Sequence, residues 1–311
     1  MASVILATYN GEKYIEKQVL SILNQTQLPK MIYVIDDGSK DGTLEKLYQL
    51  KKISSNKKVD LQISQNEKNL GYALNFWKGL TSVNDDILFL CDQDDVWFPN
   101  KVEAMVKIFK NNNDILTLNT AYKLIDEKGA SISNFKSKAF SDNKKIKKIG
   151  IYDFIKSPRY PGMSMAVRGG LMNELKEIKL NSIYAHDWFL NFNAAMRDGM
   201  YFYDSILVGY RQHHNNTVGV ISEFEKKSLI EHRIKTIKDQ EKCLQLSKDL
   251  ITDKELNTFI VKSLELLSLR KNYVEEKNFL NELILYMKYH KYVSKRCFLG
   301  DMYSILKSIG D

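Results

Sequence analysis

The chain alternates short apolar runs with amphipathic segments, and this alternation restricts its fold more than any other feature of the sequence. Runs typical of β-strands occupy Ser3–Ala7, Met31–Ile35, Leu61–Ser64, Ile87–Cys91 and Ile115–Leu118. Segments with the apolar spacing of helices separate them, at Tyr14–Leu23, Leu44–Ile53, Tyr72–Leu80 and Lys101–Phe109. Strands that alternate with helices predict an α/β fold, with a mostly parallel central sheet that helices cover on both faces.

Residues that can carry chemistry follow three of the predicted strands directly. They are Thr8-Tyr9-Asn10-Gly11 after the first strand, Asp36-Asp37-Gly38-Ser39 after the second and Asp92-Gln93-Asp94-Asp95 after the fourth. In sheets of this kind, ligands bind at the carboxyl ends of the strands. The sequence therefore predicts a binding site at that edge of the sheet.

The acidic turn Asp92-Gln93-Asp94-Asp95 places three carboxylates within four residues. Such groups repel one another unless a cation or a hydrogen-bonding ligand lies among them. Mg²⁺ and Mn²⁺ prefer carboxylate oxygens and keep positions open for phosphate oxygens, so Asp92 and Asp94 are candidate ligands. The alternative is a solvated acidic turn in which Asp95 or Asn100 caps the next helix.

The turn after the second strand is suited to recognition of a base. Asp36 or Asp37, presented beside Gly38, can accept a hydrogen bond from the imide N–H of uracil or thymine. Backbone groups of Thr8 to Asn10 would frame that base. The alternative is a plain loop that caps the helix at Thr43.

The second half of the chain is less regular up to about Val220, and long amphipathic helical patterns then continue to its end. We expect one domain over residues 1–220, followed by a C-terminal helical region over 221–311. The basic run Lys144–Lys148 favours a solvated loop over a binding patch.

Composition excludes several classes of protein. The 311 residues fit one large domain with an appendage, and three cysteines without metal-ligand spacing argue against a disulfide framework. No basic leader precedes a long apolar segment, which predicts a cytoplasmic protein. A net charge of +8 suits nucleic acid, an anionic membrane or phosphorylated substrates. The acidic character of the predicted site argues against nucleic acid.

The ordered set of motifs resembles the nucleotide-sugar half of the inverting glycosyltransferase family 2. The motifs are Thr8-Tyr9-Asn10, Ile35-Asp36-Asp37-Gly38-Ser39-Lys40-Asp41-Gly42-Thr43, Asn69-Leu70-Gly71 and Asp92-Gln93-Asp94-Asp95. Two further motifs, His186-Asp187-Trp188 and Tyr210-Arg211-Gln212-His213, are similar to the bacterial rhamnosyltransferase branch of that family. The resemblance covers roughly residues 1–220 and implies a catalytic domain there, with a nucleotide-binding half at about 1–120 and an acceptor half at about 121–220. It implies the glycosyltransferase A-type fold, a nucleoside-diphosphate sugar donor and a Mn²⁺ or Mg²⁺ cofactor.

The resemblance also implies roles for individual residues. Asp187 matches the catalytic base, which removes a proton from the acceptor hydroxyl, and the positive end of a helix dipole would favour its negative charge. Capping of that helix is the alternative role. The implied metal ligands are Asp92, Asp94 and His213, although the neighbouring His214 leaves open which histidine faces the metal. The implied nucleotide-sugar contacts are Thr8, Tyr9, Asn10, Asp36, Asp37, Asn69, Gly71, Asp92, Gln93 and Arg211.

A second group of residues is assigned to the donor sugar or the acceptor. Gly162-Met163-Ser164 resembles the loop beneath the donor sugar, where a missing side chain permits close approach. His186 and Trp188 flank the candidate base, and Trp97 and Trp188 are suited either to stack on sugar faces or to fill the core.

The resulting hypothesis is a metal-dependent inverting glycosyltransferase that moves a sugar, with L-rhamnose from dTDP-rhamnose as one donor, to a surface polysaccharide or a lipid-linked oligosaccharide. A UDP-hexose-dependent transferase of the same fold is the main alternative. A nucleotidyltransferase is a weaker one, because Tyr9-Asn10-Gly11-Glu12-Lys13 is a poor phosphate loop.

The C-terminal region mixes aromatic and cationic side chains near its end. The mixed set comprises Tyr286, Lys288, Tyr289, His290, Lys291, Tyr292, Lys295, Arg296 and Phe298. Such a mixture suits peripheral contact with an anionic membrane, here the inner face of the plasma membrane, and a solvated helix face is the alternative. The helical patterns predict packing against the catalytic domain or against a second copy in a homodimer.

Overall fold

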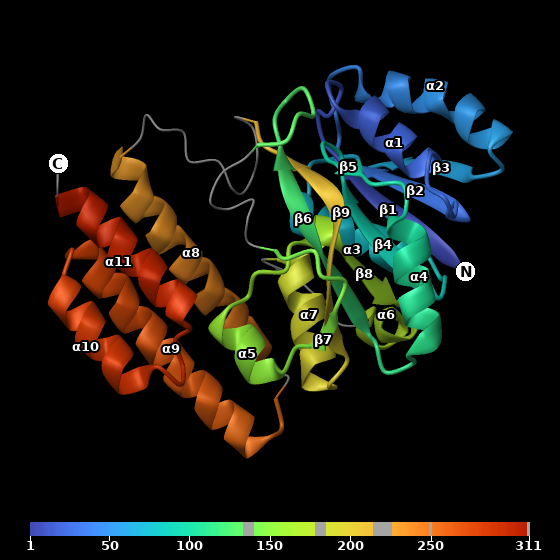
Figure 1. Ribbon diagram of the computed structural model, residues 1–311. Helices are drawn as coiled ribbons and strands as arrows, with labels where there is room; N and C mark the ends of the chain where they lie inside the picture. The colour runs from blue at the N-terminus through green and yellow to red at the C-terminus, as the bar shows by residue number, and fades with distance from the viewer. Residues whose placement is uncertain (133–139, 178–184, 214–225, 249–250, 310–311) are drawn as a thin grey trace. The chain divides into compact units, whose positions relative to one another are not determined.

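The computed structural model describes residues 1–132, 140–177, 185–213, 226–248 and 251–309. The chain folds into two compact units (Figure 1). The first comprises Met1–Gly150 and Tyr160–Asn216, and the second comprises Ile151–Arg159 and Thr217–Asp311. The nine-stranded sheet of the first unit carries all the strand-end motifs identified in the sequence.

Four parallel strands form one half of this sheet, in the order β3-β2-β1-β4. They are β1 (Ala2–Thr8), β2 (Met31–Asp36), β3 (Asp60–Gln65) and β4 (Ile87–Asp92). The helices between and after them are α1 (Ile15–Leu23), α2 (Thr43–Asn56), α3 (Tyr72–Ser82) and α4 (Lys101–Asn111). These eight elements confirm the alternation predicted from the sequence, because fully buried apolar side chains such as Val4, Leu6 and Phe89 occupy the predicted strands.

The other half of the sheet has mixed pairing. Strand β8 (Met165–Arg168) pairs antiparallel with β4 and with β6 (Thr117–Ile125), and β9 (Met200–Arg211) runs parallel to β6. Two short strands, β5 (Val96–Trp97) and β7 (Ile146–Lys148), pair antiparallel with β9. The sheet is therefore less uniformly parallel than the alternation predicts.

The direction of β8 follows from how the chain enters it. The 3₁₀-turn η2 (Gly162–Ser164) brings the chain to the carboxyl edge of β4, so β8 must run back along that strand, with Val167 opposite Leu88. The same chain reversal places Gly162 at the predicted ligand-binding edge. The basic run at Lys144–Lys148, which the sequence favours as a loop, contributes the edge strand β7 instead, because its backbone pairs with β9.

Four helices dominate the second unit: α8 (Lys226–Ser247), α9 (Lys254–Glu275), α10 (Phe279–Tyr289) and α11 (Lys295–Ile309). The unit also includes α5 (Ile151–Lys156), which the sequence had grouped with the predicted acceptor half. Two contacts explain this placement. Gln240 Nε2 donates to the Ile155 carbonyl at 2.6 Å, and the rings of Tyr152 and Phe259 lie 4.8 Å apart.

The helical unit contains a buried group of charges. Asp301 is inaccessible to solvent and accepts hydrogen bonds from the guanidinium groups of Arg233 and Arg270. Glu282 is also fully buried, and burial together with the nearby Asp301 carboxylate raises the pKa of Glu282 to about 8. Glu282 is therefore protonated at neutral pH.

The raised pKa of Glu282 predicts a pH-dependent stability. The folded state binds more protons than the unfolded state between the ordinary carboxyl pKa of 4.5 and about 8, so its stability falls as pH rises through this window. We expect the free energy of unfolding to be lower at pH 9 than at pH 6 by at least about 1 kcal/mol. Glu282→Gln, which mimics the protonated side chain, should flatten this dependence in urea titrations followed by circular dichroism. Glu265→Gln, an exposed change in the same unit, should leave it unaltered.

Candidate active site

Asp36 holds together the loops that follow β1 and β2. Its two carboxylate oxygens accept hydrogen bonds from Thr8 Oγ1 at 2.9 Å, from Ser39 Oγ at 2.5 Å and from Gln65 Nε2 at 3.2 Å. The backbone N–H groups of Gly38 and Ser39 donate to it as well. Asp36 is thus buried and saturated with donors, and its carboxylate fixes the shape of the turn.

Asp37 performs a different task, because it anchors the segment Asn69-Leu70-Gly71. Its Oδ1 accepts from Asn66 Nδ2 and from Leu70 N, both at 2.8 Å, while its Oδ2 accepts from Gly71 N at 2.9 Å. Gly71 has a φ of +82°, a conformation that a residue with a side chain adopts only with strain. The predicted contact residues Asn69 and Gly71 are therefore held directly beside the Asp37 turn.

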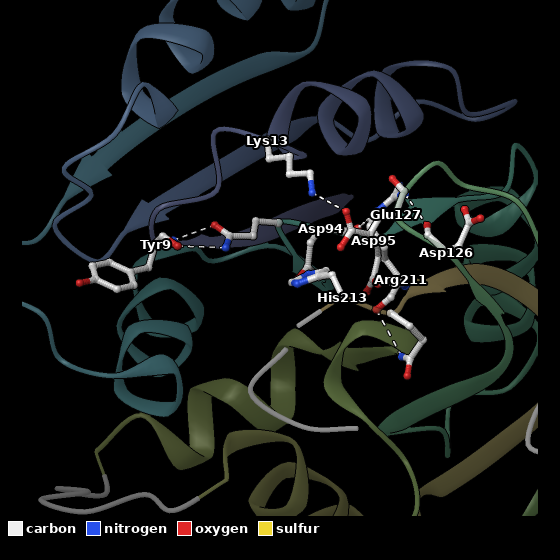
Figure 2. Close-up of polar contacts among 10 residues, drawn as sticks. Tyr9, Lys13, Asp94, Asp95, Asp126, Glu127, Arg211 and His213 are labelled. Atoms are coloured by element: carbon white, nitrogen blue, oxygen red, sulfur yellow. Dashed lines mark hydrogen bonds and ion pairs between the residues drawn. The ribbon is translucent and has the colours of Figure 1, made fainter. Parts of the chain in front are cut away.

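The loop after β1 is joined to the acidic turn through Gln93. The Tyr9 N–H donates to Gln93 Oε1 at 2.8 Å, and Gln93 Nε2 donates back to the Tyr9 carbonyl at 3.0 Å (Figure 2). Asn10 lies on the other side of this loop, where its N–H donates to Ser39 Oγ and its side chain accepts from Lys40 N. The Tyr9 side chain remains exposed at this edge. All three predicted strand-end motifs thus meet in one hydrogen-bonded surface.

Within the acidic turn, the three carboxylates occupy different environments. Asp95 is fully buried, and its Oδ1 accepts from Arg211 N at 3.0 Å, so this side chain joins the acidic turn to β9 and does not cap α4 from a solvated turn. Burial and the adjacent Asp94 and Asp92 raise the pKa of Asp95 well above its usual range. Burial also raises the pKa of Asp92 to about 7, and Asp94 and Asp187 add to this rise. Negative charge is therefore crowded around Asp92.

Asp94 faces the histidine that follows β9. His213 Nε2 lies 2.8 Å from Asp94 Oδ2 (Figure 2). The His213 ring stacks on Tyr14 at 4.9 Å. Both side chains are largely shielded from solvent. The neighbouring His214 lies outside the described residues. Among those that are described, no group of three or more His, Cys, Asp or Glu side chains is arranged to hold a metal ion.

Arg211 holds the backbone of Asp94 in place. Its Nε donates to the Asp94 carbonyl at 2.6 Å, and its Nη1 donates to the carbonyls of Asp126 and Glu127 at 2.9 and 2.8 Å (Figure 2). The side chain is fully buried, with its guanidinium 5.0 Å from the centre of the Tyr14 ring. The sequence analysis placed Arg211 among the nucleotide-sugar contacts, whereas in the structure its Nε and Nη1 donate to backbone carbonyls, because three chain segments converge there.

Asp187 lies in the first turn of α7 (His186–Met196) and faces η2. Its Oδ2 accepts from Gly162 N at 3.0 Å, and its Oδ1 accepts from Trp188 N at 2.7 Å. A Cβ atom at Gly162 would lie only 2.8 Å from His186 Nε2, so glycine is required for this close approach. The predicted base and the predicted donor-sugar loop are therefore in direct contact.

The neighbours of Asp187 are buried more deeply than the sequence suggested. Trp188 stacks on Phe192 at 4.8 Å, and Trp97 packs against Phe89, so both indole rings fill the core. Met163 and Ser164 are also buried. The side chains of Met163 and Ser164 are directed inward because η2 packs against the sheet. Of the three η2 residues, Gly162 is the one that contacts Asp187.

His186 is buried between η2 and α3. Its ring stacks on Phe76 at 4.1 Å, and neither ring nitrogen has a hydrogen-bond partner within the described part of the chain. Burial lowers the pKa of His186, which favours the neutral imidazole. The neutral ring thus lies against Gly162, one residue before the candidate base.

Lys101 is a site residue that sequence reasoning missed. It is fully buried at the start of α4, where its Nζ donates to the Met163 carbonyl at 2.8 Å and lies 4.0 Å from the centre of the Trp97 ring. Burial lowers the pKa of Lys101 to about 7, against the opposing charges of Asp95 and Asp92. Lys101 therefore links the acidic turn to η2. A lysine at a helix start gives no sign of this burial in a single sequence.

Comparisons with known proteins add an independent observation. The family model described as "Glycosyl transferase family 2" matches residues 3–168. A curated protein from Shigella flexneri named dTDP-rhamnosyl transferase RfbG is 30% identical over 234 residues, which cover 71% of this chain and 76% of that protein. An uncharacterized glycosyltransferase from Haemophilus influenzae is 28% identical over 94% of this chain and 87% of its own length.

Solved structures show the same fold at low sequence identity. S. aureus TarS in complex with UDP-GlcNAc has a TM-score of 0.62 and 18% identity, covering 99% of this chain and 88% of the TarS chain. The mannosyltransferase PcManGT from Pyrobaculum calidifontis, solved with GDP-Man and Mn²⁺, has a TM-score of 0.58 and 13% identity over 99% of this chain and 86% of its own.

Proposed function

This chain belongs to glycosyl transferase family 2, and on that premise we propose that it transfers L-rhamnose from a dTDP donor to a surface polysaccharide or a lipid-linked oligosaccharide. The family and the glycosyltransferase A-type fold, both predicted from the sequence, are confirmed, and the enzyme is a glycosyltransferase that uses a nucleotide-sugar donor. The likeness to the Shigella dTDP-rhamnosyl transferase supports the choice of rhamnose. The proposed action is at the inner face of the cytoplasmic membrane.

One observation carries the proposal: hydrogen bonds join the loops after β1, β2 and β4, the Asp94–His213 pair lies in the last of these loops, and Asp187 is near enough to Asp92 for its charge to raise the pKa of Asp92. We assign recognition of the base to Asp37. Within the described structure, Asp37 Oδ2 accepts a single hydrogen bond, from Gly71 N, and so can accept another from an imide N–H, whereas both oxygens of Asp36 are already occupied.

Asp94 and His213 offer two ligand atoms of the kind that a divalent cation takes, although the described side chains include no group of three arranged around one. A carboxylate and an imidazole are in contact at Asp94 and His213. Burial raises the pKa of Asp92 to about 7, and the negative charges of Asp94 and Asp187, which add to this rise, are what a cation would relieve. Asp94 and His213 would hold Mn²⁺ or Mg²⁺ with Asp92 beside them. When bound, such a cation neutralises charge that develops on a diphosphate leaving group.

Asp187 is the proposed base. The N–H groups of Gly162 and Trp188 fix the orientation of its two oxygens. As the acceptor oxygen attacks the anomeric carbon, its proton passes to the Asp187 carboxylate. The bond between that carbon and the diphosphate oxygen breaks, and its electron pair leaves with the diphosphate. Attack from the side opposite the leaving group inverts the configuration of the anomeric carbon.

Nucleotide binding provides the direct test. We expect dTDP with Mn²⁺ to raise the thermal midpoint more than UDP or GDP does, because the proposed donor is a dTDP sugar. Ligand binding at about 100 times Kd stabilises a folded protein by about 2.7 kcal/mol. The part of the shift that requires Mn²⁺ should disappear in Asp94→Asn. It should persist in Asp114→Asn, which changes an exposed carboxylate.

Two outcomes would change the assignment. A larger shift with UDP than with dTDP would favour the UDP-hexose-dependent alternative. Absence of a shift with every nucleotide, with and without Mn²⁺, would overturn the proposed site.

A further inference from the structure

Helices α10 and α11 form a hairpin whose inner face belongs to the core of the second unit. Leu285, Phe298 and Met302 are buried there, and Tyr286 stacks on Phe298 at 4.1 Å. Tyr289 and Tyr292 pack against the same cluster. The aromatic residues that the sequence suggested for membrane contact therefore pack largely within the bundle, and any such contact must use other side chains.

The outer faces of the two helices expose a different set of apolar residues. On α10 these are Leu280, Ile284 and Met287, and on α11 they are Leu299, Tyr303 and Leu306. Each triplet follows the spacing i, i+4, i+7, which places its members along one side of a helix. All six residues are between 51% and 69% exposed. We call these two stripes, with the cations that border them, the α10–α11 face.

The exposed charges on this hairpin have one sign. Between Phe279 and Ile309 the chain contains two carboxylates, Glu282 and Asp301, and both are fully buried. The exposed charged side chains of this segment are cations: Lys288, Lys291, Lys295, Arg296 and Lys307. A solvated helix normally exposes both signs of charge, so an apolar face bordered by cations alone calls for a complementary anionic surface.

We propose that the α10–α11 face docks onto an anionic lipid bilayer, with the apolar stripes inserted at the headgroup boundary and the cations paired with lipid phosphates. A second copy of the chain fits less well, because a twofold interface would bring the same unpaired cations together. Among the described residues, no helix has the length and apolar character needed to cross a bilayer.

Sedimentation of the full-length protein with lipid vesicles tests this inference without any donor or acceptor sugar. We expect binding to vesicles that contain phosphatidylglycerol and little binding to pure phosphatidylcholine. Replacement of Lys288, Lys295 and Arg296 by Gln should weaken partitioning by about 100-fold, since each cation near an anionic surface contributes about five-fold. Ile284→Gln with Met287→Gln should weaken it by at least about ten-fold. Raising the salt to 1 M should remove the electrostatic part.

Matched variants separate the α10–α11 face from general charge and hydrophobicity. Lys17→Gln, Lys52→Gln and Lys110→Gln remove the same charge from exposed positions of the first unit, and Val261→Gln changes an exposed apolar residue of α9. These controls should bind vesicles as the unaltered protein does. Equal loss in variant and control, or no binding to anionic vesicles, would overturn the inference. A concentration-dependent dimer that Ile284→Gln dissociates would assign the face to a second copy instead.

Discussion

Replacing Asp187 by Asn is expected to reduce sugar transfer by about 10²- to 10⁴-fold, the usual contribution of a positioned general base. Asparagine retains the shape of the side chain and an oxygen that can accept from Gly162 N, so the loop should keep its position. The amide, however, cannot take the proton of the acceptor hydroxyl. Initial rates of transfer, compared with donor affinity from calorimetry, should show a loss in turnover at nearly unchanged binding.

The matched control for this variant is Asp198→Asn. Asp198 is an exposed carboxylate just beyond the end of α7, with a φ of +57° that asparagine also tolerates. Its replacement should leave transfer intact. If Asp187→Asn retained turnover close to that of the unaltered enzyme, Asp187 would be removed from the mechanism and its contact with Gly162 N would be purely structural.

Lys101→Met is expected to lower the free energy of unfolding by about 3 kcal/mol and to abolish activity. When one charged side chain is removed from a buried cluster of opposite charges, the charges that remain lose their electrostatic compensation. Here the remaining carboxylates are those of Asp92 and Asp95, and the Met163 carbonyl also loses its donor. Urea titration of the variant, beside Lys110→Met at an exposed position of the same helix, measures the difference.

A double-mutant cycle shows whether the cost arises from this charge cluster. Once Asp95 is replaced by Asn, removal of Lys101 leaves one fewer buried carboxylate without compensation, so the two effects should be less than additive. Strict additivity would contradict the coupling between Lys101 and Asp95, and so would a cost for Lys101→Met no larger than that of Lys110→Met.

The parallel half of the sheet could be predicted because β1, β2 and β4 are rich in apolar residues, β3 alternates apolar and polar residues, and the intervening helices have clear periodicity. The pairing of the mixed half could not, since β5 and β7 are short and their pairing with β9 depends on tertiary position rather than on local pattern. The turn at η2 makes β8 run antiparallel to β4, and no periodic pattern in the sequence indicates this direction.

The site shows the same division. Strand-end position was enough to predict that Tyr9, Asp36 and Gln93 would come together, because parallel strands end at one edge. Which of the site side chains would be buried could not be predicted. A tryptophan beside the candidate base looks the same in the sequence whether its ring faces a sugar or the core. In the same way, an arginine after a strand can face a phosphate or a set of backbone carbonyls. These alternatives are decided by side chains that are distant in the sequence.

The position of Arg211 has a consequence for how this protein folds. Its bonds to Asp94 and Asp95 join residues 117 and 116 positions apart in the sequence, and they form only when β9 is in place beside β6 and β5. Contacts between such distant parts of a chain carry a large loop-closure entropy and generally slow folding. His213 lies two residues beyond β9, so its contact with Asp94 also forms only when β9 has docked. If the proposed metal site is correct, a chain emerging from synthesis can bind the metal there only after this last strand is in place.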